Sequence, residues 1–190
     1  MLILTSLTEA STVGMYAVAL TCASASGGLT QALNQVSYSR LAVVSKGSIP
    51  QALASRSVYG ALMSMVSGGL IVGAVALVGE RLFGPGFELL LPTTAILVLV
   101  QLLNDQWQLR VYFHSANEAA NSLALSSGAA LVALGLTVAA LELSGIMSGI
   151  AMAWAVLGFA GIRLVALYCI ERTGMKPHAA SKATTRSASE

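Results

Sequence analysis

A short polar stretch interrupts one of the most apolar parts of this chain, in the segment VQLLNDQWQLR. Gln101, Asp105 and Gln108 are spaced at i, i+4 and i+7, so in a helix they share one face. An ionisable side chain at the centre of a membrane costs about 2.5–3.5 kcal/mol, and it usually faces a cavity or a partner. The spacing therefore predicts a polar surface along a transport pathway. Two alternatives stay open: Asp105 lies near the cytoplasmic interface, or it pairs with Arg110.

A second polar pattern occurs earlier in the chain, where Gln31, Gln35 and Tyr38 repeat the same spacing and Asn34 is adjacent. In a helix this stripe either lines an aqueous cavity or forms hydrogen bonds to neighbouring helices. Arg163 is an isolated charge within GFAGIRLVALYC. It either extends towards the cytoplasmic surface or faces a cavity, where an anion or Asp105 is a plausible partner.

Residues that could support catalysis or metal binding do not form a recognisable pattern. The sequence contains no nucleotide-binding loop, zinc-protease motif, nucleophile elbow or kinase motif. His114 and His178 have no nearby partners in the sequence, and Cys22 and Cys169 lie within apolar runs. We therefore expect neither an enzyme nor a cofactor or metal site.

The composition indicates which elements position these side chains. Of the 190 residues, 56% are hydrophobic and 9% are charged, and the mean hydropathy is +0.78. Soluble domains carry about 25% charged residues, so the apolar side chains here must face lipid. Long continuous apolar runs predict an all-α, polytopic transmembrane helix bundle with about five spans. The spans are expected near residues 13–36, 58–78, 89–109, 123–141 and 146–170, preceded by a truncated helix at 1–7.

Charges in the connections predict the orientation. The segment 40–56 and the C-terminal tail are basic, whereas Glu9, the turn 79–88 and Glu142 supply acidic groups elsewhere. Cytoplasmic loops carry an excess of Lys and Arg. We therefore expect an external N-terminus and a disordered cytoplasmic tail at 173–190, in the cytoplasmic membrane, with no role in binding nucleic acid.

Small residues are spaced for close contact between helices. Gly60, Ser64 and Gly68 recur at four-residue steps, as do Gly69 and Gly73. Gly145 and Gly149 repeat that spacing. Small side chains allow helix backbones to approach within a membrane, so these positions predict a tightly packed bundle.

Several segments resemble a known transporter family in their order and spacing. VGMYAVALTCASASGGLTQALNQVSYSRLA, ERLFGPGFELLLPTTAILVLVQLL and LSGIMSGIAMAW resemble spans and turns of Wzx-type polysaccharide flippases of the MOP superfamily, which have a MATE-like fold. The similarity covers residues 1 to about 172. The family's proline near the end of the first matched span is absent, and Ser37 and Ser39 lie around that place.

The resemblance implies the C-terminal half of a flippase that moves lipid-linked oligosaccharides by alternating access. It implies that a missing N-terminal bundle or a homo-oligomer partner completes the transporter. Arg40 or Arg163 would then attract the pyrophosphate of the lipid-linked glycan. The residues expected to contact sugar or coupling cations are Gln31, Gln35, Gln101 and Asp105.

Two further functions stay open from the sequence. One is a MATE-type exporter, in which Asp105 is the proton or sodium site. The other is a non-transporting membrane scaffold or assembly subunit, which requires no cavity.

Overall fold

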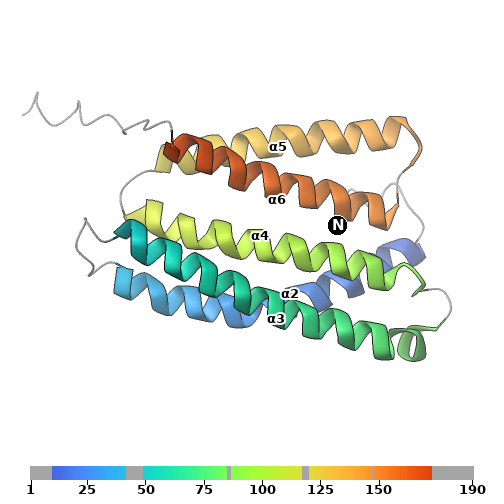
Figure 1. Ribbon diagram of the computed structural model, residues 1–190. Helices are drawn as coiled ribbons and strands as arrows, with labels where there is room; N and C mark the ends of the chain where they lie inside the picture. Colours follow the sequence, from blue (N-terminus) through green and yellow to red (C-terminus); the bar gives the residue numbers. More distant parts are fainter. Residues whose placement is uncertain (1–9, 42–48, 85–86, 117–119, 147, 173–190) are drawn as a thin grey trace, which may run out of the picture.

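The computed structural model describes residues 10–41, 49–84, 87–116, 120–146 and 148–172. These residues form helices and contain no strand, which confirms the predicted all-α bundle. The predicted truncated helix at 1–7 and the predicted tail at 173–190 lie outside the described residues. The helices (Figure 1) are α2 (Ala10–Leu41), α3 (Ile49–Phe83), α4 (Leu90–Ala116), α5 (Ala120–Leu143) and α6 (Gly149–Arg172).

Four of the described helices are long and apolar enough to cross a membrane, through the segments Ser11–Val36, Ala54–Gly79, Asn121–Leu143 and Gly149–Glu171. A helix of 24 residues, the length of α5 and of α6, extends about 36 Å. That length exceeds the hydrocarbon thickness of a bilayer, which is about 30 Å. The chain is therefore a multi-pass membrane protein.

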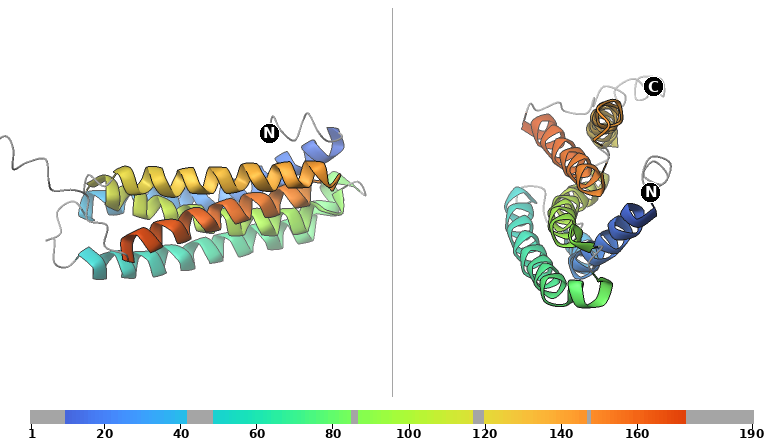
Figure 2. Two further views of the ribbon diagram at one scale, coloured as in Figure 1. Left: turned by 90° about the horizontal axis from the view of Figure 1, so that it is seen from above. Right: turned by 90° about the vertical axis from the view of Figure 1, so that its right-hand side faces the viewer.

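Helix α4 is not among these four segments, although it has 27 residues. Its lower hydropathy follows from the polar sequence NDQWQ. In the end-on view of Figure 2, α4 lies in the middle of the bundle, in contact with α2, α3 and α6. Helix α5 packs mainly against α6, at one edge. Helix α4, with its polar sequence NDQWQ, thus lies where neighbouring helices separate it from lipid, because exposing these side chains to hydrocarbon would be costly.

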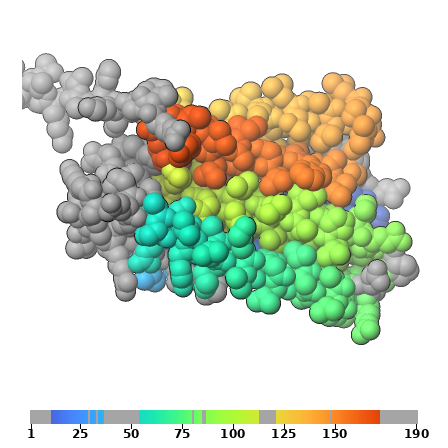
Figure 3. Space-filling model, viewed as in Figure 1, coloured from blue at the N-terminus to red at the C-terminus, as the bar shows by residue number. Residues whose placement is uncertain are grey.

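The bundle exposes many large apolar side chains, and it also buries several polar ones. Large apolar residues project outward from α3, where Leu70 and Leu77 are 71% and 78% exposed. Buried positions include polar side chains such as Thr30, Ser64 and Asp105. Figure 3 shows the outer surface of α3 beside α4 and α6. Lipid provides no hydrophobic drive for helix association. The interior combines small and polar residues with packed apolar ones such as Leu90, Leu97 and Val98.

The predicted small-residue face of α3 packs directly against α4. Gly60, Ser64 and Gly68 are all buried, and a Cβ atom added to Gly68 would overlap a methyl group of Val98. By contrast, Gly69 and Gly73 are exposed, and added Cβ atoms there would meet no atom within 4 Å. The prediction of close contact is therefore confirmed for the first set of small residues, whereas the second set faces outward.

The turn that joins α5 to α6 is defined by local hydrogen bonds. The amide of Gly145 donates to the carbonyl of Glu142 at 3.1 Å, and that of Ile146 donates to Leu141 at 3.3 Å. This is the Schellman pattern, which requires a residue with positive φ after the helix. Gly145 supplies it with a φ of 66°. Ser148 then caps α6 by accepting a hydrogen bond from the amide of Ala151 at 3.2 Å.

Candidate functional site

Asp105 is the centre of a buried polar cluster near the middle of α4. Its side chain is 1% exposed. Its Oδ2 atom accepts a hydrogen bond from the hydroxyl of Ser64 on α3 at 2.7 Å. Its Oδ1 atom accepts one from the amide of Gln101, one helical turn earlier, at 2.9 Å. The predicted shared face of Gln101 and Asp105 is confirmed by this contact.

Helix α2 completes the cluster with two buried side chains. The hydroxyl of Thr30 lies 3.0 Å from that of Ser64. Because Ser64 donates its proton to Asp105, Thr30 must be the donor in this contact. Asn34 donates from its side-chain amide to the backbone carbonyl of Asp105 at 3.3 Å. Thr30, Asn34, Ser64, Gln101 and Asp105 are called the Asp105 cluster below.

A glycine makes room for the cluster. Gly27 on α2 is buried, and a Cβ atom there would overlap the side chain of Gln101. Any larger residue would push Gln101 away from Asp105. The hydrogen bond between Gln101 and Asp105 therefore depends on the absence of a side chain at Gly27.

The chemistry of the Asp105 cluster is that of hydroxyl, amide and carboxylate groups. Within the described residues, no cationic side chain forms an ion pair with Asp105, and no three His, Cys, Asp or Glu side chains converge on a metal site. Hydroxyls from Thr30 and Ser64 lead in a hydrogen-bonded chain to one carboxylate oxygen. Such a cluster can accept a proton, or it can bind a small hard cation through oxygen atoms.

Arg163 occupies a second polar site, on the side of α4 that faces α6. Its Nη2 atom donates to Oδ1 of Asn104 at 2.5 Å. The guanidinium carbon lies 3.8 Å from the centre of the Trp107 ring and 5.0 Å from that of Phe159. Arg163 therefore does not pair with Asp105, because the adjacent residues 104 and 105 point to different sides of α4.

Two hydrogen-bond donors in this second site are unsatisfied. Nε of Arg163 and Nε1 of Trp107 are buried, and neither has a hydrogen-bond partner within the described part of the chain. An unsatisfied buried donor costs about 1–3 kcal/mol. A ligand or partner with acceptor oxygens would recover part of that cost.

The suggested pair of Asp105 with Arg110 is not formed. Arg110 instead forms an ion pair with Glu171 on α6, and its guanidinium lies 5.7 Å from the centre of the Tyr168 ring. Position 110 is five residues after position 105, and this spacing places the two side chains on different faces of the helix. Arg110 thus links α4 to the C-terminal end of α6, and it does not neutralise the buried carboxylate.

The structure separates Gln31 and Gln35 from the Asp105 cluster. Both side chains are exposed, and the neighbouring Thr30 and Asn34 point inward instead. One residue corresponds to a rotation of about 100° around a helix, so Thr30 and Asn34 face inward while Gln31 and Gln35 face outward. Gln31 and Gln35 belong to an exposed set spaced at alternating three- and four-residue steps, called the α2 stripe: Thr21, Ser24, Gly28, Gln31 and Gln35. The side chain of Arg40 lies outside the described residues.

Sequence reasoning missed several residues that complete these sites. Ser64 was identified only as a small packing residue, and Asn104 and Trp107 were not identified as contacts of Arg163. A partial signal exists for the last two, since they lie three residues apart and therefore share a face of α4. The reciprocal pair of Ser57 and Gln106 between α3 and α4 was also missed.

The chain was compared with models of protein families, with curated proteins and with solved structures. None of the three comparisons found a match.

Proposed function

We propose that this chain is one bundle of a membrane transporter that works by alternating access. Its substrate would be a lipid-linked oligosaccharide, as the resemblance to polysaccharide flippases implies. In this mechanism two bundles rock around a central polar pathway near the middle of the membrane. The second bundle would be an N-terminal bundle or another copy of the chain.

The observation that carries the proposal is the exposure of the α2 stripe. Thr21 and Ser24 satisfy their hydroxyls through backbone carbonyls of α2, at 2.9 and 2.7 Å. The side-chain amides of Gln31 and Gln35 make no hydrogen bond to another described residue, although both residues lie within a candidate span. Polar groups in this position are tolerated only where they meet water or protein. This side of α2 is therefore better suited to a pathway or a second bundle than to lipid.

The Asp105 cluster adds support from the opposite side of α2. A buried carboxylate in a membrane helix is typical of ion and proton pathways. Thr30 contacts the Ser64 hydroxyl that donates to this carboxylate, and Asn34 donates to the backbone carbonyl of Asp105. A movement of α2 would break both of these hydrogen bonds. In the proposal, rocking of α2 changes the environment of Asp105. Arg163 would attract the pyrophosphate group of the substrate by its charge.

Cysteine labelling tests whether water reaches the α2 stripe. Cys22 and Cys169 are first replaced by Ala, and single cysteines are placed at Gln31 and Gln35. A membrane-impermeant thiol reagent should label them about tenfold faster than cysteines at Leu62 and Leu70, which are exposed on α3. Equal rates at all four positions would rule out an aqueous pathway along α2 and would favour a non-transporting scaffold.

Export of glycan tests the substrate. Full-length protein carrying Asp105→Asn or Arg163→Gln should fail to restore glycan export in a strain that lacks a flippase, while its amount in the membrane stays unchanged. Leu70→Ala, on the outer face of α3, is the matched control and should retain export. Normal export by both polar variants would withdraw the roles of Asp105 and Arg163.

A second candidate is a cation-coupled exporter, which the composition of the Asp105 cluster favours. The cluster places the hydroxyls of Ser64 and Thr30 in a chain beside a single carboxylate, and such oxygen atoms can bind a monovalent cation or a proton. Dye efflux that depends on a sodium or proton gradient, and that is lost in Asp105→Asn, would support this alternative. Rescue of glycan export without any dye efflux would support the flippase.

A further inference from the structure

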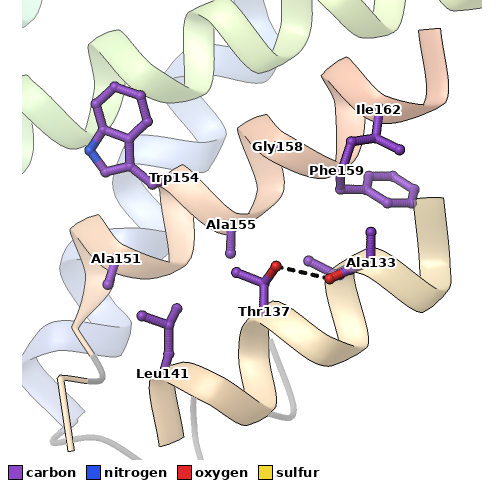
Figure 4. A pocket seen from close by; sticks show the side chains of 10 residues that line it. Ala133, Thr137, Leu141, Ala151, Trp154, Ala155, Gly158, Phe159 and Ile162 are labelled. Carbon is purple, nitrogen blue, oxygen red and sulfur yellow. Dashed lines mark hydrogen bonds between the residues drawn. The ribbon is translucent and has the colours of Figure 1, made fainter. Parts of the chain in front are cut away.

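A groove lies along the boundary between α5 and α6, on the side of the bundle away from the Asp105 cluster. Its volume is about 360 Å³. Figure 4 shows that small side chains form much of its lining, which leaves an open channel between the two helices. The residues that define it here are Ala133 and Thr137 on α5, with Ala151, Ala155, Gly158 and Ile162 on α6.

Leu134, Leu141, Trp154 and Phe159 complete the lining of this groove, and the indole N–H of Trp154 is a polar group at its edge. The six residues named above offer no free hydrogen-bonding group. Thr137 carries their one polar side chain, and its hydroxyl donates to the carbonyl of Ala133 at 2.9 Å, as drawn in Figure 4. The ring of Trp154, at the edge of the groove, points away from α5. A sugar or a phosphate would lose its hydration in the groove without gaining a partner. The suitable occupant is therefore apolar.

The length and width of the groove restrict the occupant further. From Ala151 to Ile162 along α6 the distance is about 16 Å, close to half of the hydrocarbon thickness. Dividing the volume of about 360 Å³ by this length gives a cross-section of about 22 Å². A single hydrocarbon chain, about 5 Å across with its contact distances, fits the cross-section.

We propose that this groove binds one acyl chain of a bilayer phospholipid, with the headgroup at the α5–α6 turn. The groove begins beside that turn and ends near the middle of α6, so it spans one leaflet. Trp154 is 58% exposed and lies near the turn, where the indole ring suits the headgroup region. Binding would come from close contacts and not from the hydrophobic effect, since the chain leaves one apolar environment for another. This site does not depend on the proposed transport function.

Photo-crosslinking of the full chain tests the proposal. The protein is placed in vesicles of phosphatidylethanolamine and phosphatidylglycerol that contain a trace of phosphatidylethanolamine with a diazirine on one acyl chain. After irradiation, labelled peptides are identified by mass spectrometry. Labelling should concentrate on residues 151–162 of α6 and exceed labelling of the exposed surface of α3 by about fivefold, a difference of about 1 kcal/mol in occupancy.

Variants that fill the groove provide the decisive comparison. Gly158→Leu and Thr137→Leu should each lower labelling of residues 151–162 by about fivefold. Gly135→Leu is the matched control, because Gly135 is exposed on α5 outside the groove. Thr137→Leu keeps the test valid if Gly158→Leu fails to fold, as judged by size-exclusion chromatography and circular dichroism.

Three results would overturn the proposal. Labelling that is unchanged by both groove-filling variants would show that the acyl chain binds elsewhere. Loss of labelling on adding a polyprenyl phosphate would assign the groove to an isoprenoid chain. Cross-links between two copies through residues 151–162 would assign it to a protein interface.

Discussion

Replacement of Gly68 by Ala is the sharpest test of how closely α3 packs against α4. A Cβ atom at Gly68 would overlap a methyl group of Val98, and Val98 is only 8% exposed. Valine has one strongly preferred side-chain rotamer in a helix, so it cannot turn away at little cost. The two helices must therefore separate, or the Val98 side chain must be strained.

The magnitude follows from comparison with the adjacent glycine. Gly68→Ala and Gly69→Ala gain the same helix propensity, which is about 1 kcal/mol in soluble helices. A Cβ atom at Gly69 meets no atom within 4 Å, so Gly69→Ala carries no packing cost. Overpacking a helix contact costs about 1–3 kcal/mol. Gly68→Ala should therefore be less stable than Gly69→Ala by about 1–3 kcal/mol.

Equilibrium unfolding of the full chain in mixed micelles, with increasing sodium dodecyl sulfate, measures this difference. Circular dichroism and the fluorescence of Trp107 and Trp154 report the transition. The double variant Gly68→Ala with Val98→Ala removes the overlapping methyl group. It should show a favourable coupling energy of about 1–3 kcal/mol relative to the sum of the single variants. Equal stability of Gly68→Ala and Gly69→Ala would refute the close contact.

Three more contacts give expectations that the same unfolding assay measures. Gln106→Leu should lower stability by about 1–2 kcal/mol, since it removes both hydrogen bonds to α3; an unchanged value would argue against that pair. Gly145→Ala should cost about 1 kcal/mol because of its positive φ, whereas Gly135→Ala, inside α5, should raise stability by up to about 1 kcal/mol through helix propensity. In a double-mutant cycle of Arg110→Ala and Glu171→Ala, the coupling should be at most about 1 kcal/mol and should fall with added salt, as for a partly exposed ion pair. A larger coupling that is insensitive to salt would contradict that assignment.

Much of the fold could be predicted from the sequence because membrane spans depend on long apolar runs. The helical class, the existence of α2 to α6 and the small-residue face at Gly60, Ser64 and Gly68 follow from such patterns. Four of the five predicted spans were shorter than the observed helices, since polar residues at their ends continue the helix, whereas the span predicted at 146–170 began before α6 does. For example, α4 continues to Ala116, which places Asp105 near its middle.

The partners of the polar residues were harder to predict. Spacing along one helix correctly joined Gln101 to Asp105, because both lie on α4. It could not select Thr30 over Gln31, since both are polar and only the packing of α2 against α3 and α4 turns one of them inward. Nor could it predict that Arg163 would contact Asn104.

The sequence by itself determined that this is a multi-pass helical membrane protein with few buried charges. Apolar runs and scarce charges suffice for that conclusion, because the bilayer acts on each helix separately. The tertiary structure decided which polar groups meet. It placed α4 at the centre and directed Asp105 towards Ser64 on α3. It also left Gln31 and Gln35 exposed on α2. These outcomes depend on the rotation of each helix relative to its neighbours, and that rotation is set by packing between segments distant in the sequence.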